Sequence, residues 1–146
     1  MKLGRFTRLT AVGAIALFLA GCATSGPTFM EMQTSSKPIA ANSGRIYVYR
    51  TSALGAALQP SVKLDGMTVG DAVPEGYFFV DRPAGTYKLS TATEVDRTVS
   101  LTLNSGEVRY VRLDVSFGFF VGHISPVLVD TAEAEKEIQK LHFTGK

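Results

Sequence analysis

An alternation of apolar and polar side chains over residues 108–117 most constrains what this chain can fold into. Successive side chains of a β-strand point to opposite faces, so the alternation predicts a strand with one buried and one solvated face. The residues expected to face the core are Val111, Leu113, Val115 and Phe117, and those expected to face solvent are Tyr110, Arg112, Asp114 and Ser116. The turn sequence at 104–107 predicts a hairpin before this strand, which favours antiparallel sheets.

Further short strands with turn residues between them are predicted along the chain. They cover residues 61–65, 67–70, 77–82, 86–93, 98–103 and 127–129. Residues 44–50 carry β-branched and aromatic side chains at successive positions, which predicts a strand buried on both faces. About seven strands at this spacing favour an antiparallel β-sandwich over residues 44–146.

The end of the chain predicts a single α-helix over about residues 131–141. Asp130 with Glu133 three residues later is a capping-box pattern for a helix start. The apolar side chains of Ala134, Ile138 and Leu141 share one face of this helix, which should pack on the sandwich. The solvated face should carry Glu133 near Lys136 and Glu137 near Lys140.

The first 22 residues resemble a bacterial lipoprotein signal peptide. A positively charged start is followed by an apolar run from about residue 9 to residue 19, and then by Leu19, Ala20, Gly21 and Cys22, which resemble a lipobox. We expect cleavage before Cys22 and a lipid anchor of diacylglycerol and palmitate there. An uncleaved membrane helix is disfavoured because small and polar residues interrupt the roughly 20 apolar residues that a span requires.

Loss of residues 1–21 would remove three positive and no negative charges, which changes the net charge from +2 to −1. The remaining Lys and Arg residues are scattered singly, so no nucleic-acid partner is expected. Cys22 is the only cysteine, so we expect neither a disulfide nor redox chemistry. Ala23 after the cysteine resembles the default sorting pattern for the outer membrane of Gram-negative bacteria, where the protein would face the periplasm.

Residues 22–43 are rich in Ser, Thr, Pro and small side chains, which predicts a flexible tether. A tether of this length has a root-mean-square reach of roughly 25 Å, which would lift a domain clear of the lipid headgroups. Phe29, Met30 and Met32 are apolar within it. We expect them to pack loosely on the domain or on lipid, in preference to forming a recognition motif.

The residues that commonly carry chemistry show no catalytic pattern. His123 and His142 lie far apart in sequence and lack the spacing of a zinc site. No nucleophile elbow, phosphate-binding loop or Ser-x-x-Lys motif is present in the sequence. Four acidic residues near turns are expected to be turn residues in preference to calcium ligands: Asp65, Asp71, Glu75 and Asp81. We therefore expect no catalytic residues, metal site or cofactor.

Two segments are candidate contact surfaces. In residues 117–124 the alternation breaks, and Phe117, Phe119 and Phe120 lie beside glycines. This segment is expected to be a buried bend, with an exposed apolar loop that touches lipid or a partner as the alternative. The long loop 51–60 carries Leu54 and Leu58 and is expected to be a crossover connection or helical turn, with a binding loop as the alternative.

Several motifs, in order, resemble an uncharacterised family of bacterial lipoproteins whose domain of unknown function is a prealbumin-like sandwich. They are Gly-Arg-Ile-Tyr-Val-Tyr-Arg at 44–50, Val-Lys-Leu-Asp-Gly-Met-Thr-Val-Gly at 62–70, Tyr-Phe-Phe-Val at 77–80, Pro-Ala-Gly-Thr-Tyr-Lys-Leu at 83–89, and the closing Val-Asp at 129–130 with its Glu- and Lys-rich helix. The resemblance covers most of residues 44–143. It implies this fold and an envelope location, and it supplies no catalytic residues.

These observations predict a lipid-anchored protein of the cell envelope that binds a protein partner or a cell-wall component without catalysing a reaction. The membrane is itself expected as a partner through the anchor on Cys22. The alternative is an envelope hydrolase or a small-ligand carrier, which requires a pocket with convergent polar groups.

Overall fold

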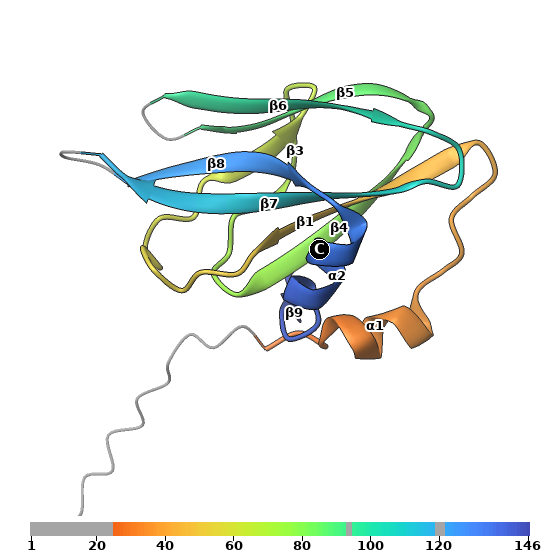
Figure 1. Cartoon of the computed structure of the whole chain (residues 1–146), viewed down its shortest axis with the longest axis horizontal. Helices are drawn as coiled ribbons and strands as arrows, with labels where there is room; N and C mark the ends of the chain where they lie inside the picture. The colour runs from red at the N-terminus through yellow and green to blue at the C-terminus, as the bar shows by residue number, and fades with distance from the viewer. Residues whose placement is uncertain (1–24, 93–94, 119–121) are drawn as a thin grey trace, which may run out of the picture.

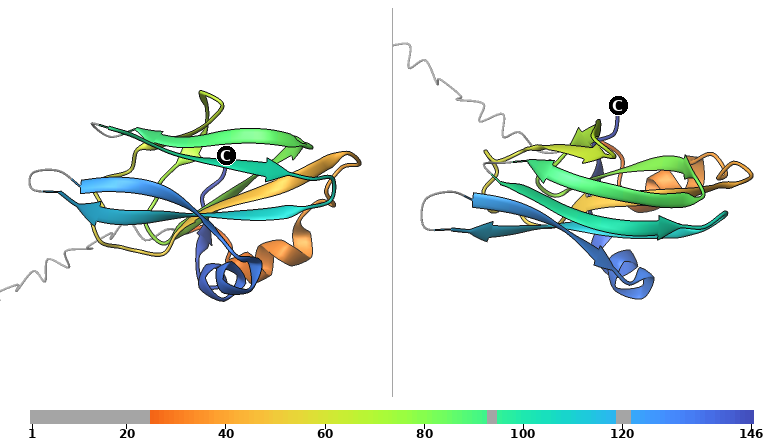
Figure 2. Two further views of the ribbon diagram at one scale, coloured as in Figure 1. Left: turned by 45° about the horizontal axis from the view of Figure 1, so that its top comes forward. Right: turned by 90° about the horizontal axis from the view of Figure 1, so that it is seen from above.

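The computed structural model describes residues 25–92, 95–118 and 122–146. It shows two β-sheets packed face to face and two helices against the outer side of one sheet (Figures 1 and 2). The elements are α1 (Phe29–Ser35), β1 (Ser43–Arg50), β2 (Ser61–Leu64), β3 (Met67–Asp71), β4 (Gly76–Pro83), β5 (Gly85–Ala92), β6 (Asp96–Leu103), β7 (Val108–Phe117), β8 (Gly122–Val129), α2 (Thr131–Ile138) and β9 (His142–Phe143). The mainly β sandwich with a C-terminal helix is confirmed.

The two sheets have different pairing patterns. The four-stranded sheet has the order β3-β2-β5-β6 and is antiparallel throughout. The five-stranded sheet has the order β8-β7-β1-β4-β9, in which β1 pairs parallel with β7 and β4 pairs parallel with β9. The antiparallel pairing predicted for the sandwich therefore holds for β1 with β4 and β7 with β8 of this sheet, but not for these two parallel pairs. The strand β8 also begins five residues before the predicted segment 127–129.

The core between the sheets follows the predicted alternation. Val111 and Leu113 of β7 are buried against Leu101 and Leu103 of β6 in one apolar cluster that also holds Ile46 of β1. Phe117 was predicted to face the same core, but it is mostly exposed because β7 extends past the end of the core. The inward face of β7 is thus correctly predicted except at its last residue.

A second apolar layer covers the outer face of the five-stranded sheet. Tyr47, Tyr77 and Tyr110 are buried there beneath α1 and α2, together with Phe29 of α1 and Ile138 of α2. The ring of Tyr47 stacks on Tyr110 with centroids 5.4 Å apart. Tyr110 was predicted to face solvent, and this was wrong because the helices cover that face. The double burial predicted for residues 44–50 is confirmed.

The segment predicted to be a flexible tether is docked on the sandwich over much of its length. The carbonyl oxygen of Gly26 is 2.8 Å from Nδ1 of His142, and that of Pro27 accepts a hydrogen bond from the backbone N–H of Phe143. A Cβ atom on Gly26 would lie 1.9 Å from the carbonyl oxygen of Phe143, so only glycine fits this close approach. The flexible tether is therefore a wrong prediction for residues 26–37.

Helix α1 holds this segment in place. The Glu31 carboxylate accepts hydrogen bonds of 2.7 Å from both the backbone N–H and the hydroxyl of Thr28, which fixes the helix start. These bonds lower the pKa of Glu31. Phe29 is buried, whereas Met30 is exposed, so the expected loose packing of the apolar residues is wrong for Phe29.

Candidate functional site

A buried arginine at the end of β1 holds the loop 51–60 against the sandwich. Arg50 is 0% exposed, and its guanidinium donates five hydrogen bonds to backbone carbonyl groups. The acceptors are the carbonyl oxygens of Ser52 (3.1 Å), Leu54 (2.6 Å), Gly55 (3.0 Å), Leu58 (2.6 Å) and Ala72 (2.8 Å). Burial lowers the pKa of Arg50. The loop has a fixed shape because the Arg50 side chain donates hydrogen bonds to backbone carbonyl groups along most of the loop.

This loop lies directly beside the β7–β8 hairpin. A Cβ atom on Gly55 would be 3.7 Å from the ring of Phe117 and from Val115. A Cβ atom on Gly122 would be 3.0 Å from Leu58 and 3.5 Å from Phe117. The structure therefore brings together the two segments that the sequence singled out separately.

Exposed apolar side chains gather at this end of the sandwich. Leu54 is 61% exposed, Phe117 is 60% exposed, and Val95, between β5 and β6, is 52% exposed. The loop 51–60, the start of β6 and the end of β7 lie on the same side of the molecule in Figure 1. Near this end the hydroxyl of Thr91 in β5 donates to the carbonyl oxygen of Ile124 in β8, which joins the two sheets. We call Leu54, Val95 and Phe117 the apolar end.

The other predicted contact residues divide into two groups. Leu58 is only partly exposed and packs against the core, so it supports the apolar end from below. Phe119 and Phe120 lie outside the described residues, as do the predicted lipobox residues Leu19, Ala20 and Gly21 and the predicted lipidation site Cys22. The expectation of a buried bend is wrong for Phe117, whereas Ile124 at the other end of this segment is buried.

The first described residues lie against the same loop. Ser25 and Gly26 line a hollow of about 690 Å³ together with Ala53 and Ala56 of the loop. Its remaining lining residues are Gln59, Val73, Pro74, Glu75, Phe143 and Thr144. Since Leu54 and Gly55 lie between Ala53 and Ala56, the N-terminal segment reaches the sandwich beside the apolar end.

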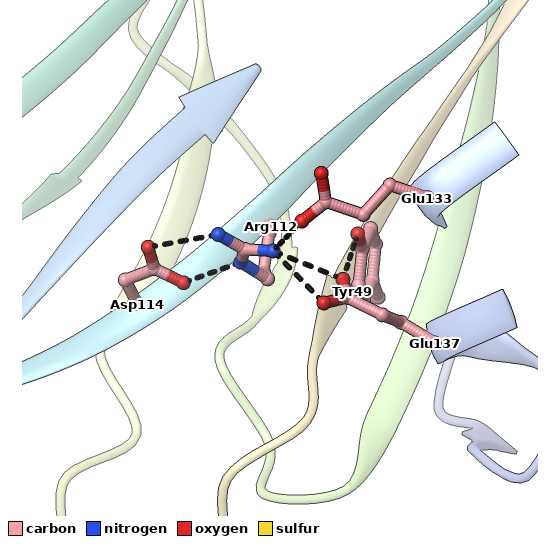
Figure 3. A network of polar contacts seen from close by, with 5 residues as sticks. All are labelled: Tyr49, Arg112, Asp114, Glu133 and Glu137. Atoms are coloured by element: carbon pink, nitrogen blue, oxygen red, sulfur yellow. Dashed lines mark hydrogen bonds and ion pairs between the residues drawn. The ribbon is translucent and has the colours of Figure 1, made fainter. Parts of the chain in front are cut away.

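A polar cluster on the outer face of the five-stranded sheet is the second candidate site. Arg112 of β7 contacts Asp114 at 2.7 Å, Glu133 at 2.8 Å and Glu137 at 2.9 Å, and the hydroxyl of Tyr49 donates to Glu137 at 2.7 Å (Figure 3). The carboxylates, Asp114 above all, raise the pKa of Arg112. Burial, followed by the bond to Glu137, raises the pKa of Tyr49.

This cluster links α2 to the sheet. Glu133 and Glu137, expected near Lys136 and Lys140, instead pair with Arg112. The side chain of Asp130 makes no capping hydrogen bond at the start of α2. A polar hollow of about 250 Å³ lies beside Arg112, between β7, β8 and the start of α2. Since Arg112 and Tyr49 already bond the helix carboxylates, these groups fix the position of α2.

The titratable residues are not assembled into a recognisable reaction centre in the described part of the chain. Nδ1 of His142 bonds a backbone carbonyl oxygen, and Nδ1 of His123 is buried and has no hydrogen-bond partner among the described residues. Asp81 pairs with Arg45 at 2.7 Å, and Asp65 accepts a bond from the backbone N–H of Lys88. No group of three or more metal-binding side chains gathers within residues 25–92, 95–118 and 122–146.

Two features of the site escaped the sequence analysis. Arg50 follows a strand of apolar and aromatic residues, but its sequence neighbours do not reveal that its partners are carbonyl groups of a later loop. The docking of the N-terminal segment had a readable signal, because Thr28 followed by Glu31 has the spacing of a capping box.

Comparisons with known proteins place the chain in a family. The family model described as "Protein of unknown function (DUF2846)" matches residues 40–124, which span β1 to the start of β8 and include the loop 51–60 and Phe117. A Haemophilus influenzae protein described as "Uncharacterized protein" is 32% identical over 94% of this chain and 84% of its own length. No solved structure matches the chain. The chain belongs to the DUF2846 family of proteins of unknown function.

Proposed function

We propose that this protein is a lipid-anchored module of the bacterial cell envelope that acts by binding, and that the apolar end is its contact surface. The anchor is on Cys22, and the protein lies at the outer membrane facing the periplasm. Its target is another component of the envelope: a protein, a cell-wall component or the lipid surface of the membrane. The observation that carries this proposal is the convergence of Leu54 and Phe117, from two separate segments, on one exposed end.

Two properties of the apolar end support a binding role. Exposed large apolar side chains that cluster on a small protein mark contact surfaces more often than scattered ones do. The loop that carries Leu54 is held by four hydrogen bonds to Arg50, so the surface is formed before any partner arrives. A preformed surface loses less conformational entropy on binding.

The polar groups support binding over catalysis. Hydrolysis requires a base positioned against a nucleophile or a water molecule. In the described segments, Arg112 with its carboxylates and Arg45 with Asp81 form pairs that hold elements together. The ring of His142 likewise holds the N-terminal segment in place through its hydrogen bond with the backbone of Gly26.

The location is supported by the N-terminal sequence and tested by labelling. None of the helices in the described segments is long and apolar enough to cross a membrane. Cells given a palmitate analogue should label the wild-type protein and leave Cys22→Ser unlabelled. A wild-type protein that takes up no label would contradict the anchor.

The binding role is tested by crosslinking in intact cells. A tagged wild-type protein should recover an envelope component that the double variant Leu54→Ser, Phe117→Ser no longer recovers. Met67→Ser is the matched control, because Met67 is 65% exposed but lies at the β2–β3 turn, away from the apolar end. Equal recovery by the double variant and the wild type would exclude the apolar end as the contact surface.

The hollow beside Ser25 supports a second candidate function, that of a small-ligand carrier. Its volume of about 690 Å³ falls within the range of ligand pockets, and Phe143 and Val73 supply apolar lining. Envelope extracts should then yield a small molecule that copurifies with the wild type, and Ala56→Phe should release it by filling the hollow. The absence of any copurifying small molecule would contradict the carrier, and retention of the molecule by Ala56→Phe would exclude the hollow as its site.

A further inference from the structure

We propose that the apolar end of this protein docks on the surface of the lipid bilayer that holds its anchor, so that Leu54, Val95 and Phe117 enter the boundary between headgroups and acyl chains. This inference rests on the proposed function and names the partner of the same surface. Three observations carry it: the length of chain before the docked segment, the place where that segment meets the sandwich, and the side chains exposed beside it.

The first observation concerns how far the sandwich can move from its anchor. Gly26 is fixed on the sandwich by its contacts with His142 and Phe143. Only the peptide units between Cys22 and Ser25 remain, and an extended chain of that length spans about 10 Å. The anchored sandwich is therefore held close to the headgroup layer.

The second observation fixes which part of the sandwich faces the bilayer. Ser25 and Gly26 share the lining of one hollow with Ala53 and Ala56, so the anchored segment joins the sandwich beside the loop 51–60. Between those two alanines lie the exposed Leu54 and Gly55, which in turn lies beside Phe117. The short link therefore places the loop 51–60 on the part of the molecule that lies near the anchor.

The third observation is the chemistry of the exposed side chains. Leucine, valine and phenylalanine gain free energy when they leave water for the acyl boundary, and phenylalanine is common on the inserting faces of peripheral membrane proteins. The loop backbone beneath them is already bonded to Arg50, so few polar groups of the loop lose water when the side chains enter. A protein partner in the periplasm would have to compete with the lipid headgroups for the same surface.

The test uses the full lipidated chain and fluorophores at single introduced cysteines. Cys22 is the only cysteine, and lipidation consumes its thiol, so Leu54→Cys and Phe117→Cys can each be labelled alone with the environment-sensitive dye NBD. Met67→Cys is the control for an exposed apolar position away from the apolar end. The purified proteins are placed in vesicles of phosphatidylethanolamine and phosphatidylglycerol, with and without spin-labelled acyl chains.

Docking predicts a blue shift and loss of most of the NBD emission to spin-labelled lipid at positions 54 and 117, with little loss at position 67. If Phe117→Cys lowers stability, NBD at Val95→Cys replaces it, and its blue shift and quenching should match those at position 54. Quenching at positions 54, 95 and 117 no greater than at position 67 would overturn the docking.

The outcomes also separate this inference from the proposed function. The lipidated protein could show NBD emission typical of water at positions 54 and 117 and yet crosslink to an envelope protein through position 54. That result would overturn docking and leave the proposed binding function standing. A wild-type protein that carries no lipid would overturn both. Deep quenching at positions 54 and 117 in vesicles that contain no other protein would support the bilayer as the partner.

Discussion

At the scale of single residues, Arg50 determines the shape of the loop at the apolar end. Its guanidinium lies in the interior and pairs with no carboxylate among the described residues, and its charge is met by the partial charges of five carbonyl oxygens. A planar group with five donors suits a ring of carbonyl groups better than the single ammonium of lysine. The exposed position of Leu54 therefore depends on a residue that touches no solvent.

Replacement of Arg50 by methionine should lower the free energy of unfolding by about 3 kcal/mol, because carbonyl groups that remain buried lose their donors. Arg50→Lys should recover part of the loss, since an ammonium offers three donors. Urea unfolding measures both variants. Arg97→Met, at an exposed position of β6, is the control and should change stability by no more than about 0.5 kcal/mol. Equal losses for Arg50→Met and Arg97→Met would contradict the role of Arg50.

The turn before β7 should make stability depend on pH through Glu107. Its carboxylate accepts bonds from the backbone N–H of Asn104 at 2.7 Å and from the Asn104 side chain at 2.9 Å, and the pKa of Glu107 lies below 4.5 as a result. A carboxyl with a lowered pKa in the folded state stabilises the fold above its unfolded pKa. That stabilisation is lost as the pH falls through the lowered value.

Glu107→Gln should therefore be less stable than the wild type at pH 7, and the difference should shrink as the pH falls below 4.5. Urea unfolding of both proteins at pH 7 and at about pH 3 measures this. A difference that stays constant, or grows toward acid, would show that the charge of Glu107 does not stabilise the turn.

At the scale of elements, α1 and α2 bury the aromatic part of the outer face of the five-stranded sheet, whereas Asp114 on that face stays partly exposed. The aromatic rings of Tyr47, Tyr77 and Phe29 meet with centroids 5.3 to 6.3 Å apart, in the edge-on and tilted arrangements that aromatic pairs favour. On the same face, Arg112 of β7 holds α2 by ion pairs with the carboxylates of Glu133 and Glu137. The helices thus use apolar packing and ion pairs on the same sheet face.

Removal of the ring of Phe29 should release α1 while the sandwich stays folded. Phe29→Ala should lower the free energy that protects the α1 amides from hydrogen exchange by about 3 kcal/mol, because a buried phenylalanine contributes that much and more. Met30→Ala is the matched control on the same helix, since Met30 is 63% exposed, and it should change protection little. Simultaneous loss of protection in β1 and β7 would contradict independent release of α1.

At the scale of the whole molecule, local patterns predicted the strands and missed the contacts between distant segments. The alternation of Val111 and Leu113 or of Leu101 and Leu103 is a local property, and the structure follows it. The parallel pairing of β1 with β7 brings Tyr49 opposite Arg112, and no local pattern encodes such a distant partner. The apolar end likewise combines separate segments, of which the loop 51–60 and β7 meet at Gly55 and Phe117, so the sequence showed its parts but not their proximity.

A longer link to the anchor should uncouple the sandwich from the bilayer. Ten Gly and Ser residues inserted between Thr24 and Ser25 add a root-mean-square reach of about 17 Å. If the short link drives docking, NBD at position 54 of this variant should lose much of its quenching by spin-labelled lipid while lipidation is unchanged. Unchanged quenching would mean that the apolar side chains hold the surface without help from the link.

The parallel pairing of β1 with β7 also fixes an order of events during synthesis. β1 leaves the ribosome early, and β4 can cover one of its edges soon afterwards through antiparallel pairing. The other edge stays unpaired until residues 108–112, which pair with residues 45–49, have been made. An unpaired edge on a strand with two apolar faces invites association with other chains. The nascent protein therefore needs protection while about 60 residues after β1 are made, and its folding should be slow for its size because its central pairing is distant in sequence.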